Sequence, residues 1–92
     1  MAREVRTVRV VICGRVQAVW FRGWTAQRAG ELGLDGWVRN CPDGSVKAVF
    51  RGDPEPVERM ISACYAGPPM AQVTDVKILE HGNPVAAGFW VR

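Results

Sequence analysis

The sequence lacks the features that mark several large classes of protein. No apolar run is long enough to cross a membrane, and Arg9 interrupts the short apolar run near the N-terminus, so neither a membrane span nor a signal peptide is expected. No block of like charge occurs, although the formal net charge is +3, so a nucleic-acid-binding arm is not indicated. Four Trp and three Phe supply apolar area to bury, which argues against disorder.

Cysteine and histidine are also scarce. The three cysteines, Cys13, Cys41 and Cys64, are widely spaced, and neither a CxxC pair nor a neighbouring histidine accompanies them. This pattern fits neither a zinc site nor a disulfide framework. We therefore expect no bound metal, free thiols and a cytoplasmic location. The one histidine, His81, falls in a turn and is expected at the surface.

Nucleotide-binding motifs and catalytic carboxylates are missing too. There is no G-x-x-x-x-G-K-[ST] and no G-x-G-x-x-G, so no nucleotide cofactor is expected. Cys13 stands nine positions before Arg22, which is not the tight Cys-to-Arg loop of thiol phosphatases. Asp35, Asp43 and Asp53 fall in turns or caps, where carboxylates usually accept hydrogen bonds from backbone amides.

The elements that the sequence does specify follow a recognisable order. Apolar periodicity predicts strands over 5–13, 34–41, 45–51, 72–80 and 89–91, and helices over 22–32 and from 54 to just before 67. This order is that of an α+β ferredoxin-like β-α-β-β-α-β sandwich, a mainly antiparallel sheet with two helices on one face. We expect residues 1–92 to form a single domain.

Turn and cap signals support these boundaries. Pro42-Asp43-Gly44 predicts a tight turn and hence an antiparallel hairpin. Asp53 followed by Pro54 predicts the start of the second helix, and Gly33 the end of the first. The expected apolar stripes are Phe21, Thr25, Ala29 and Leu32 on the first helix and Val57, Met60, Ile61 and Cys64 on the second.

The connection from residue 14 to residue 21, which we expect to be turn-like, leads to an unusual helix start. Arg22 places a cation where the helix is already electropositive, which is mildly unfavourable unless an anion is bound. Backbone N–H groups and a guanidinium together would bind a phosphate, and Gly14 would let the backbone turn sharply. An arginine near a helix start is also often only solvated, so this segment alone leaves both interpretations open.

The missing groups limit what such a phosphate site could do. With no base, nucleophile or metal, an arginine and amides can position and neutralise a phosphate but can do little to activate water. Such a site would cleave only a phosphate bond with a good leaving group. Acyl phosphates meet that requirement, and phosphate monoesters do not.

Two motifs resemble a known family. Gly14-Arg15-Val16-Gln17-Ala18-Val19-Trp20-Phe21-Arg22 resembles the acylphosphatase signature G-R-V-Q-G-V-x-F-R. Gly36-Trp37-Val38-Arg39-Asn40, followed by Asp43-Gly44-Ser45-Val46, resembles its second signature, G-W-V-[RK]-N-x-x-D-G-x-V. Gly67-Pro68-Pro69 and the closing Phe89-Trp90-Val91-Arg92 also look like landmarks of this family, so the resemblance spans nearly the whole chain.

The resemblance implies both a reaction and its residues. Acylphosphatases hydrolyse acyl phosphates to a carboxylate and inorganic phosphate. The expected small-molecule partners are therefore an acyl phosphate as substrate and phosphate as both product and inhibitor. Arg22 is expected to bind the phosphate and Asn40 to orient the attacking water, while the substrate takes the proton. The expected substrate-binding residues are those of the loop: Arg15, Val16, Gln17, Ala18, Val19, Trp20 and Phe21. We expect a monomer without cofactor, nucleic acid or membrane partner, in which Trp20 and Trp24 are candidates for lining the leaving-group side.

Two departures from the signatures keep alternatives open. Ala18 replaces a glycine, which matters if the backbone there requires a positive φ. Cys41 stands where a hydroxyl residue is common, which would weaken support for Asn40, itself otherwise interpretable as a turn-capping residue. The alternative function is a phosphate-binding module without turnover. An RNA-binding ferredoxin-like domain would need aromatics together on the open face of the sheet, whereas Phe50 and Trp37 stand singly.

Overall fold

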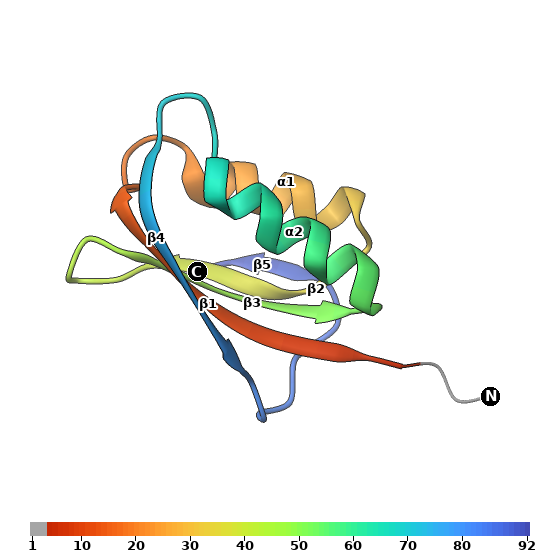
Figure 1. Ribbon diagram of the computed structural model, residues 1–92. Helices are drawn as coiled ribbons and strands as arrows, with labels where there is room; N and C mark the ends of the chain where they lie inside the picture. The colour runs from red at the N-terminus through yellow and green to blue at the C-terminus, as the bar shows by residue number, and fades with distance from the viewer. Residues whose placement is uncertain (1–3) are drawn as a thin grey trace.

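The computed structural model describes residues 4–92, so the first three residues of the expected domain lie outside the described part. Five strands and two helices follow one another in the predicted order (Figure 1). They are β1 (Arg6–Arg15), α1 (Phe21–Glu31), β2 (Asp35–Asn40), β3 (Val46–Gly52), α2 (Pro54–Ala66), β4 (Gln72–Glu80) and β5 (Phe89–Val91). None of the helices in this part of the chain is long and apolar enough to span a membrane.

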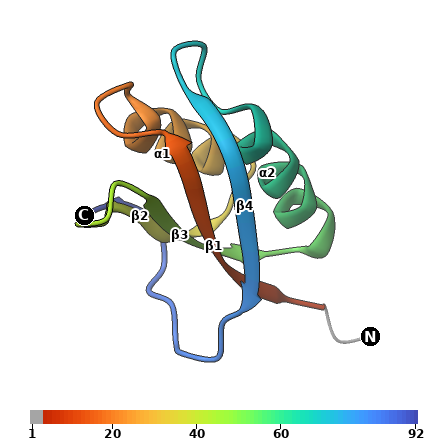
Figure 2. The same ribbon diagram turned by 60° about the vertical axis from the view of Figure 1, so that its left-hand side comes forward.

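The strands form one sheet in the order β4-β1-β3-β2-β5. Every neighbouring pair is antiparallel except β2 and β5, which run parallel. Both helices cover the same face of this sheet, as two views of the molecule show (Figures 1 and 2). The structure therefore confirms the ferredoxin-like α+β sandwich.

The core lies between the sheet and the helices, and strand alternation fills it. Val8, Val10 and Ile12 of β1 are fully buried, whereas the alternate residues of that strand are only partly buried. The predicted stripe of α2 is buried in full, and so is that of α1 apart from the partly buried Leu32. This packing holds the start of α1 in a fixed place over the sheet.

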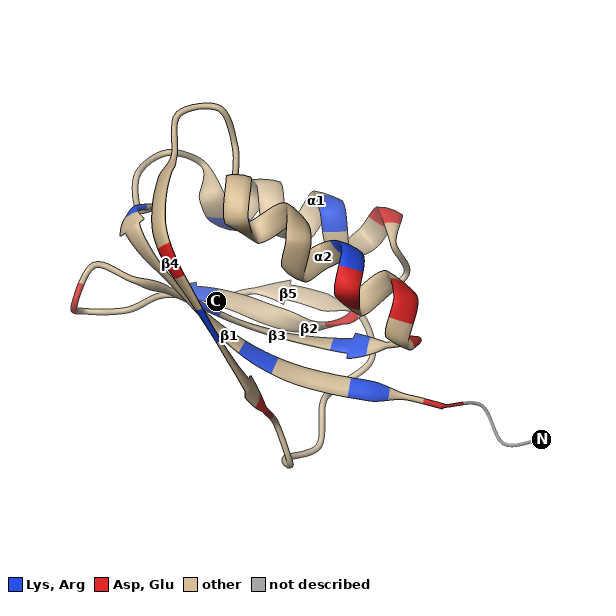
Figure 3. Cartoon of the chain, viewed as in Figure 1, with Lys and Arg blue, Asp and Glu red and all other residues tan. Residues whose placement is uncertain are grey.

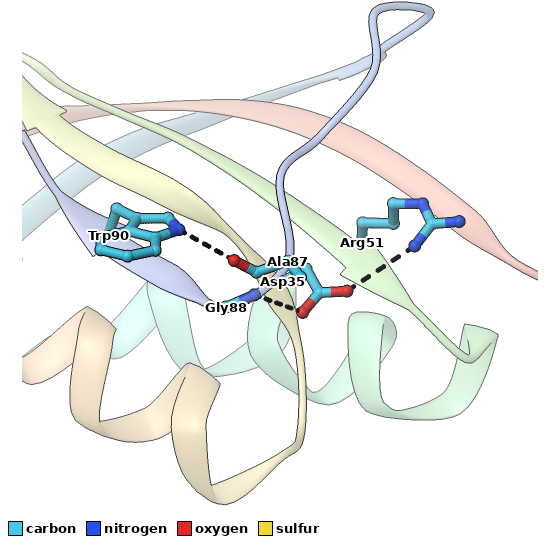
Figure 4. Close-up of polar contacts among 5 residues, drawn as sticks. All are labelled: Asp35, Arg51, Ala87, Gly88 and Trp90. Atoms are coloured by element: carbon cyan, nitrogen blue, oxygen red, sulfur yellow. Dashed lines mark hydrogen bonds and ion pairs between the residues drawn. The ribbon is translucent and has the colours of Figure 1, made fainter.

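The short closing strand pairs with β2, and polar contacts surround its start (Figure 4). Asp35 Oδ1 accepts a hydrogen bond of 2.9 Å from the Gly88 amide, and its Oδ2 lies 3.6 Å from Arg51 Nη1. The indole Nε1 of Trp90 donates to the carbonyl of Ala87 at 3.0 Å. Asp35 therefore accepts from a backbone amide as predicted, but its expected place in a turn or cap is wrong, because it is the first residue of β2 and the amide belongs to a residue distant in the sequence. These contacts bring the C-terminal residues beside β2.

One expected boundary is wrong in an informative way. Residues 14 and 15 were expected in a turn-like connection, but β1 continues through them and pairs with β4, with a register shift after Cys13. Gly14 has φ +120°, and a Cβ there would stand 2.1 Å from the carbonyl oxygen of Gln72. The glycine is therefore required by a bulge against a neighbouring strand. The other element boundaries differ from the predicted ones by at most one residue.

Candidate active site

A pocket of about 210 Å³ opens where the loop after β1 meets the ends of β2 and β5. It brings Arg22 and Asn40 together, although they are 18 positions apart in the sequence. The residues that line it are Ala18, Trp20, Phe21, Arg22, Gly23, Asn40 and Val91. The pocket therefore combines a helix N-terminus, a guanidinium and a side-chain amide.

The start of α1 is left open for an anion. Its N-cap residue, Trp20, makes no side-chain capping bond, and its first turn holds no acidic residue. The one acid of this helix, Glu31, lies at its far end (Figure 3). Within the described chain, none of the amides from residue 18 to residue 23 donates to another backbone group, and the first such donor is the Trp24 amide. These N–H groups and the helix dipole together favour a bound anion.

The guanidinium of Arg22 is already positioned at this helix start. Its Nη1 donates to the carbonyl oxygen of Arg92 at 3.1 Å, and the Arg92 amide donates to the Val38 carbonyl at 2.9 Å. The side chain is thereby tied to β2 two residues before Asn40. Because a guanidinium carries five N–H donors, further donors remain for two oxygens of one anion.

Asn40 is the last residue of β2, and its side chain is exposed and makes no hydrogen bond within residues 4–92. The turn that follows it is held by Asp43, whose Oδ1 accepts from the hydroxyl of Ser45 at 2.6 Å and from its amide at 3.0 Å. These two bonds, the hydroxyl first, lower the pKa of Asp43 below its ordinary value of 3.8. The turn accordingly keeps its charged acceptor at neutral pH, and the side-chain amide of Asn40 is free to bind a ligand or water.

Gln17 has a role that the sequence did not reveal. It was expected to contribute a loop amide, but its side-chain Nε2 donates to the carbonyl oxygens of Cys41 at 2.7 Å and Ser45 at 2.9 Å. Both carbonyls belong to the turn after Asn40. The contact therefore fixes the distance between the loop that carries the amides and the hairpin that carries Asn40.

We expect Gln17→Met to separate these two halves of the site. Methionine has a similar length but donates no hydrogen bond. The carbonyls of Cys41 and Ser45 each lose one hydrogen bond and keep the one from a backbone amide of the turn, so the expected cost is about 1–2 kcal/mol of folding stability. We expect kcat for benzoyl phosphate hydrolysis to fall about tenfold, with a smaller change in the inhibition constant of phosphate. The exposed Gln27→Met of α1 is the matched control. An unchanged kcat in the Gln17 variant would contradict this positioning role.

Several expected loop residues do not line the pocket. Val16 is fully buried in the core and Val19 packs partly against it, which anchors the loop. Arg15 is exposed and pairs with Gln72 of β4. Their proposed role as amide donors stays a prediction.

Two lining residues were missed by the sequence interpretation. Gly23, an unexpected glycine in the first turn of a helix, was a signal that could have been used. Val91 gave no local signal, because its place in the site depends on the pairing of β5 with β2.

Ala18 occupies a backbone conformation that suits glycine. Its φ is +59°, and Trp20, two residues later, also has a positive φ of +62°. Of the two cases that the sequence left open, the structure thus shows the strained one. An L-residue in this region costs roughly 1–2 kcal/mol relative to ordinary conformations. The loop keeps its shape despite this cost because Val16 and Phe21 on either side are buried.

Ala18→Gly should therefore stabilise the protein. Relief of the strain outweighs the greater freedom of glycine in the unfolded chain, so we expect a gain of about 1 kcal/mol and a rise in Tm of about 4–8 °C. Ala86→Gly is the matched control, because Ala86 is an exposed loop alanine without a positive φ. That control should be neutral or slightly destabilised. Thermal unfolding measures both, and a lower Tm for Ala18→Gly would show that the alanine is not strained.

Trp24 and the three cysteines are not among the residues that line the pocket. Trp24 packs edge-on against Phe21, with ring centroids 5.3 Å apart. Burial raises the pKa of the Cys64 thiol to about 12, so this thiol stays neutral. Cys13 and Cys41 are free and half-buried. Within residues 4–92, no three His, Cys, Asp or Glu side chains gather into a group that could hold a metal ion.

The open face of the sheet carries an aromatic pair that the sequence did not predict. Trp37 and Trp90 are neighbours in the register of β2 and β5. The guanidinium carbons of Arg39 and Arg92 lie 5.5 Å and 5.2 Å from the centre of the Trp37 ring. Phe50, by contrast, is fully buried in the core beneath the helices. Trp37 is therefore not single, because a strand distant in the sequence supplies its neighbour.

Comparison with known proteins gives a consistent result. The family model described as Acylphosphatase matches residues 8–90. The chain is 48% identical to the acylphosphatase of Rhodospirillum rubrum over 85 residues, which is 92% of this chain and 93% of that protein. It is 55% identical to that of Trichormus variabilis over 86 residues, or 92% and 84% of the two chains. The solved structure of an acylphosphatase from Coxiella burnetii, 33% identical, superposes with a TM-score of 0.91 over 96% of this chain and 93% of the other.

Proposed function

The chain belongs to the acylphosphatase family, and from this premise we propose how its residues hydrolyse an acyl phosphate. The enzyme converts an acyl phosphate to a carboxylate and inorganic phosphate. One observation carries the assignment of residues: an uncapped helix N-terminus, Arg22 and Asn40 share one pocket. The first two attract a phosphate, and the third can hold a water molecule.

The phosphate of the substrate binds in the loop. Its oxygens accept hydrogen bonds from backbone amides between residues 18 and 23 and from the guanidinium of Arg22. These donors are in place before the substrate arrives, since the buried Val16 and Phe21 fix the loop and Arg92 holds the guanidinium. Preorganised donors stabilise the charge on the transferring phosphoryl group at little reorganisation cost.

Asn40 orients the attacking water. Its side-chain carbonyl accepts a hydrogen bond from the water and so turns a lone pair toward phosphorus. The water oxygen bonds to phosphorus, the bond between phosphorus and the acyl oxygen breaks, and that electron pair leaves with the carboxylate. A carboxylate is a good leaving group, because its conjugate acid has a pKa of about 4.

The substrate itself accepts the proton from water. The residues that line the pocket include no carboxylate, imidazole or thiol that could act as a general base. A phosphoryl oxygen therefore takes the proton, and the product leaves as dihydrogen phosphate. The product retains the contacts of the substrate phosphate, so inorganic phosphate inhibits competitively.

Partners and setting follow the same proposal. A small-molecule acyl phosphate is the substrate, and we propose that the enzyme acts as a monomer, since Arg22 and Asn40 of one chain line the same pocket. The free thiols of Cys13, Cys41 and Cys64 suit the reducing environment of the cytoplasm.

The reaction is tested by assaying the purified protein with benzoyl phosphate and with p-nitrophenyl phosphate, both in excess EDTA. The proposal predicts hydrolysis of the acyl phosphate and no hydrolysis of the monoester, because the phenolate of the monoester is a poorer leaving group than a carboxylate. Binding of inorganic phosphate without any hydrolysis of benzoyl phosphate would instead support a phosphate-binding module.

A further inference from the structure

Trp20 is the most unusual residue at the pocket. It lines the pocket together with Arg22 and Asn40, and 63% of its surface is exposed. Its backbone has φ +62° and ψ +23°, the left-handed region, where a bulky residue is rare and strained. A large apolar side chain that is neither buried nor in a relaxed backbone conformation contributes little to folding. Strain of this kind gathers at functional sites, so the residue calls for a functional explanation.

The absence of a side chain at Gly23 leaves room for the indole of Trp20 to lie against α1. A Cβ on Gly23 would stand 2.1 Å from Nε1 of Trp20 and 2.7 Å from its Cδ1 and Cε2. The ring therefore lies directly against the backbone of the first turn of α1, and Gly23 also lines the pocket. This contact places the ring next to the amides that receive the phosphate.

The pocket thus has a polar side and an apolar side. Arg22, Asn40 and the loop amides form the polar side. Trp20 and Val91, which is 51% exposed, supply apolar surface that is open to a ligand. An acyl phosphate also has a polar part and an apolar part. Its phosphate is charged, whereas its acyl group carries no charge in the simplest substrates.

We propose that Trp20, with Val91, forms the binding surface for the acyl group and makes the enzyme prefer acyl phosphates with an aromatic or large apolar acyl group. The proposal rests on the function proposed above, which places the phosphate at Arg22. The acyl group then extends out of the loop along the exposed indole. Contact with the ring removes apolar surface from water on both partners, and an aromatic acyl group adds a favourable ring–ring contact.

The test compares kcat/KM for benzoyl phosphate and acetyl phosphate in the wild type, Trp20→Ala, Trp20→Phe and Trp90→Ala. The ratio of the two values cancels losses that affect both substrates equally. Alanine is a suitable replacement because Ala18 already adopts a positive φ in this loop. Trp90 is the matched control, since it is 56% exposed and does not line the pocket.

We expect Trp20→Ala to lower the benzoyl-to-acetyl ratio about tenfold, Trp20→Phe to restore most of it, and Trp90→Ala to leave it unchanged. Trp20→Ala should likewise weaken inhibition by a non-hydrolysable phenacyl phosphonate more than inhibition by inorganic phosphate. An unchanged ratio in Trp20→Ala, with acetyl phosphate still hydrolysed, would overturn the acyl-binding role of Trp20 and leave the proposed function standing. A wild-type protein that hydrolyses neither substrate would overturn the proposed function and this inference together.

Discussion

Arg22→Ala is expected to lower kcat/KM for benzoyl phosphate by about 10³-fold or more, the largest loss that any single substitution should cause. Among residues 4–92, the guanidinium is the one cation that lines the pocket, and it shares that pocket with the start of α1. Without it, the charge on the transferring phosphoryl group loses two directed hydrogen bonds. Inhibition by inorganic phosphate should be lost in parallel, because product and substrate use the same contacts. Both constants can be measured by following benzoyl phosphate at increasing phosphate concentration.

The fold should survive this substitution. The side chain of Arg22 makes one hydrogen bond within the described chain, to the exposed backbone oxygen of Arg92, and a cation at a helix start is mildly unfavourable by itself. Arg28→Ala, in the last turn of the same helix, is the control that removes an equal charge away from the pocket. Arg22→Lys keeps the charge but loses the two-pronged geometry, so it should remain strongly impaired. Substantial activity in a folded Arg22→Ala protein would contradict the assigned role.

Asn40→Ala should separate water orientation from phosphate binding. We expect kcat to fall by roughly 10²-fold or more, whereas the inhibition constant of phosphate should change little. Stability should stay within about 0.5 kcal/mol of the wild type, since the exposed side chain makes no hydrogen bond within residues 4–92. Steady-state kinetics and thermal unfolding of the same variant test both parts.

Asn83→Ala, an exposed asparagine in the connection before β5, is the control for this substitution and should retain full activity. Asn40→Asp is a stricter test, because a carboxylate so close to the phosphate adds repulsion. It should be no more active than Asn40→Ala. If Asn40→Ala weakened phosphate inhibition as strongly as Arg22→Ala does, Asn40 would be a phosphate ligand and the division of roles would be wrong.

The fold could be predicted from sequence because its signals are local. The stripe from Val57 to Cys64 identifies the buried face of α2, and the Pro42-Asp43-Gly44 turn fixes the β2–β3 hairpin. Gly14 shows the limit of such signals. A glycine there indicated a turn, whereas its positive φ serves a bulge against the backbone of β4. No local pattern shows which distant strand a glycine will face.

The sequence predicted individual residues of the candidate site better than it predicted which of them lie together. Arg22 and Asn40 could each be named from a motif, but their common pocket depends on packing α1 above β2. Val91 enters it only because β5 crosses to pair with β2, and Gln17 reaches the hairpin through its side chain. At Ala18 the sequence allowed either a strained positive φ or an ordinary negative φ, and only the structure shows that φ is positive.

The most direct test of the account is a crystal structure of the protein with bound phosphate. We predict one phosphate whose oxygens lie about 3 Å from amide nitrogens between residues 18 and 23 and from the guanidinium of Arg22. A water molecule on Asn40 should lie opposite the oxygen that corresponds to the leaving group. A phosphate bound elsewhere, for example between Arg39 and Arg92 on the open face, with the loop amides left unoccupied, would contradict the account.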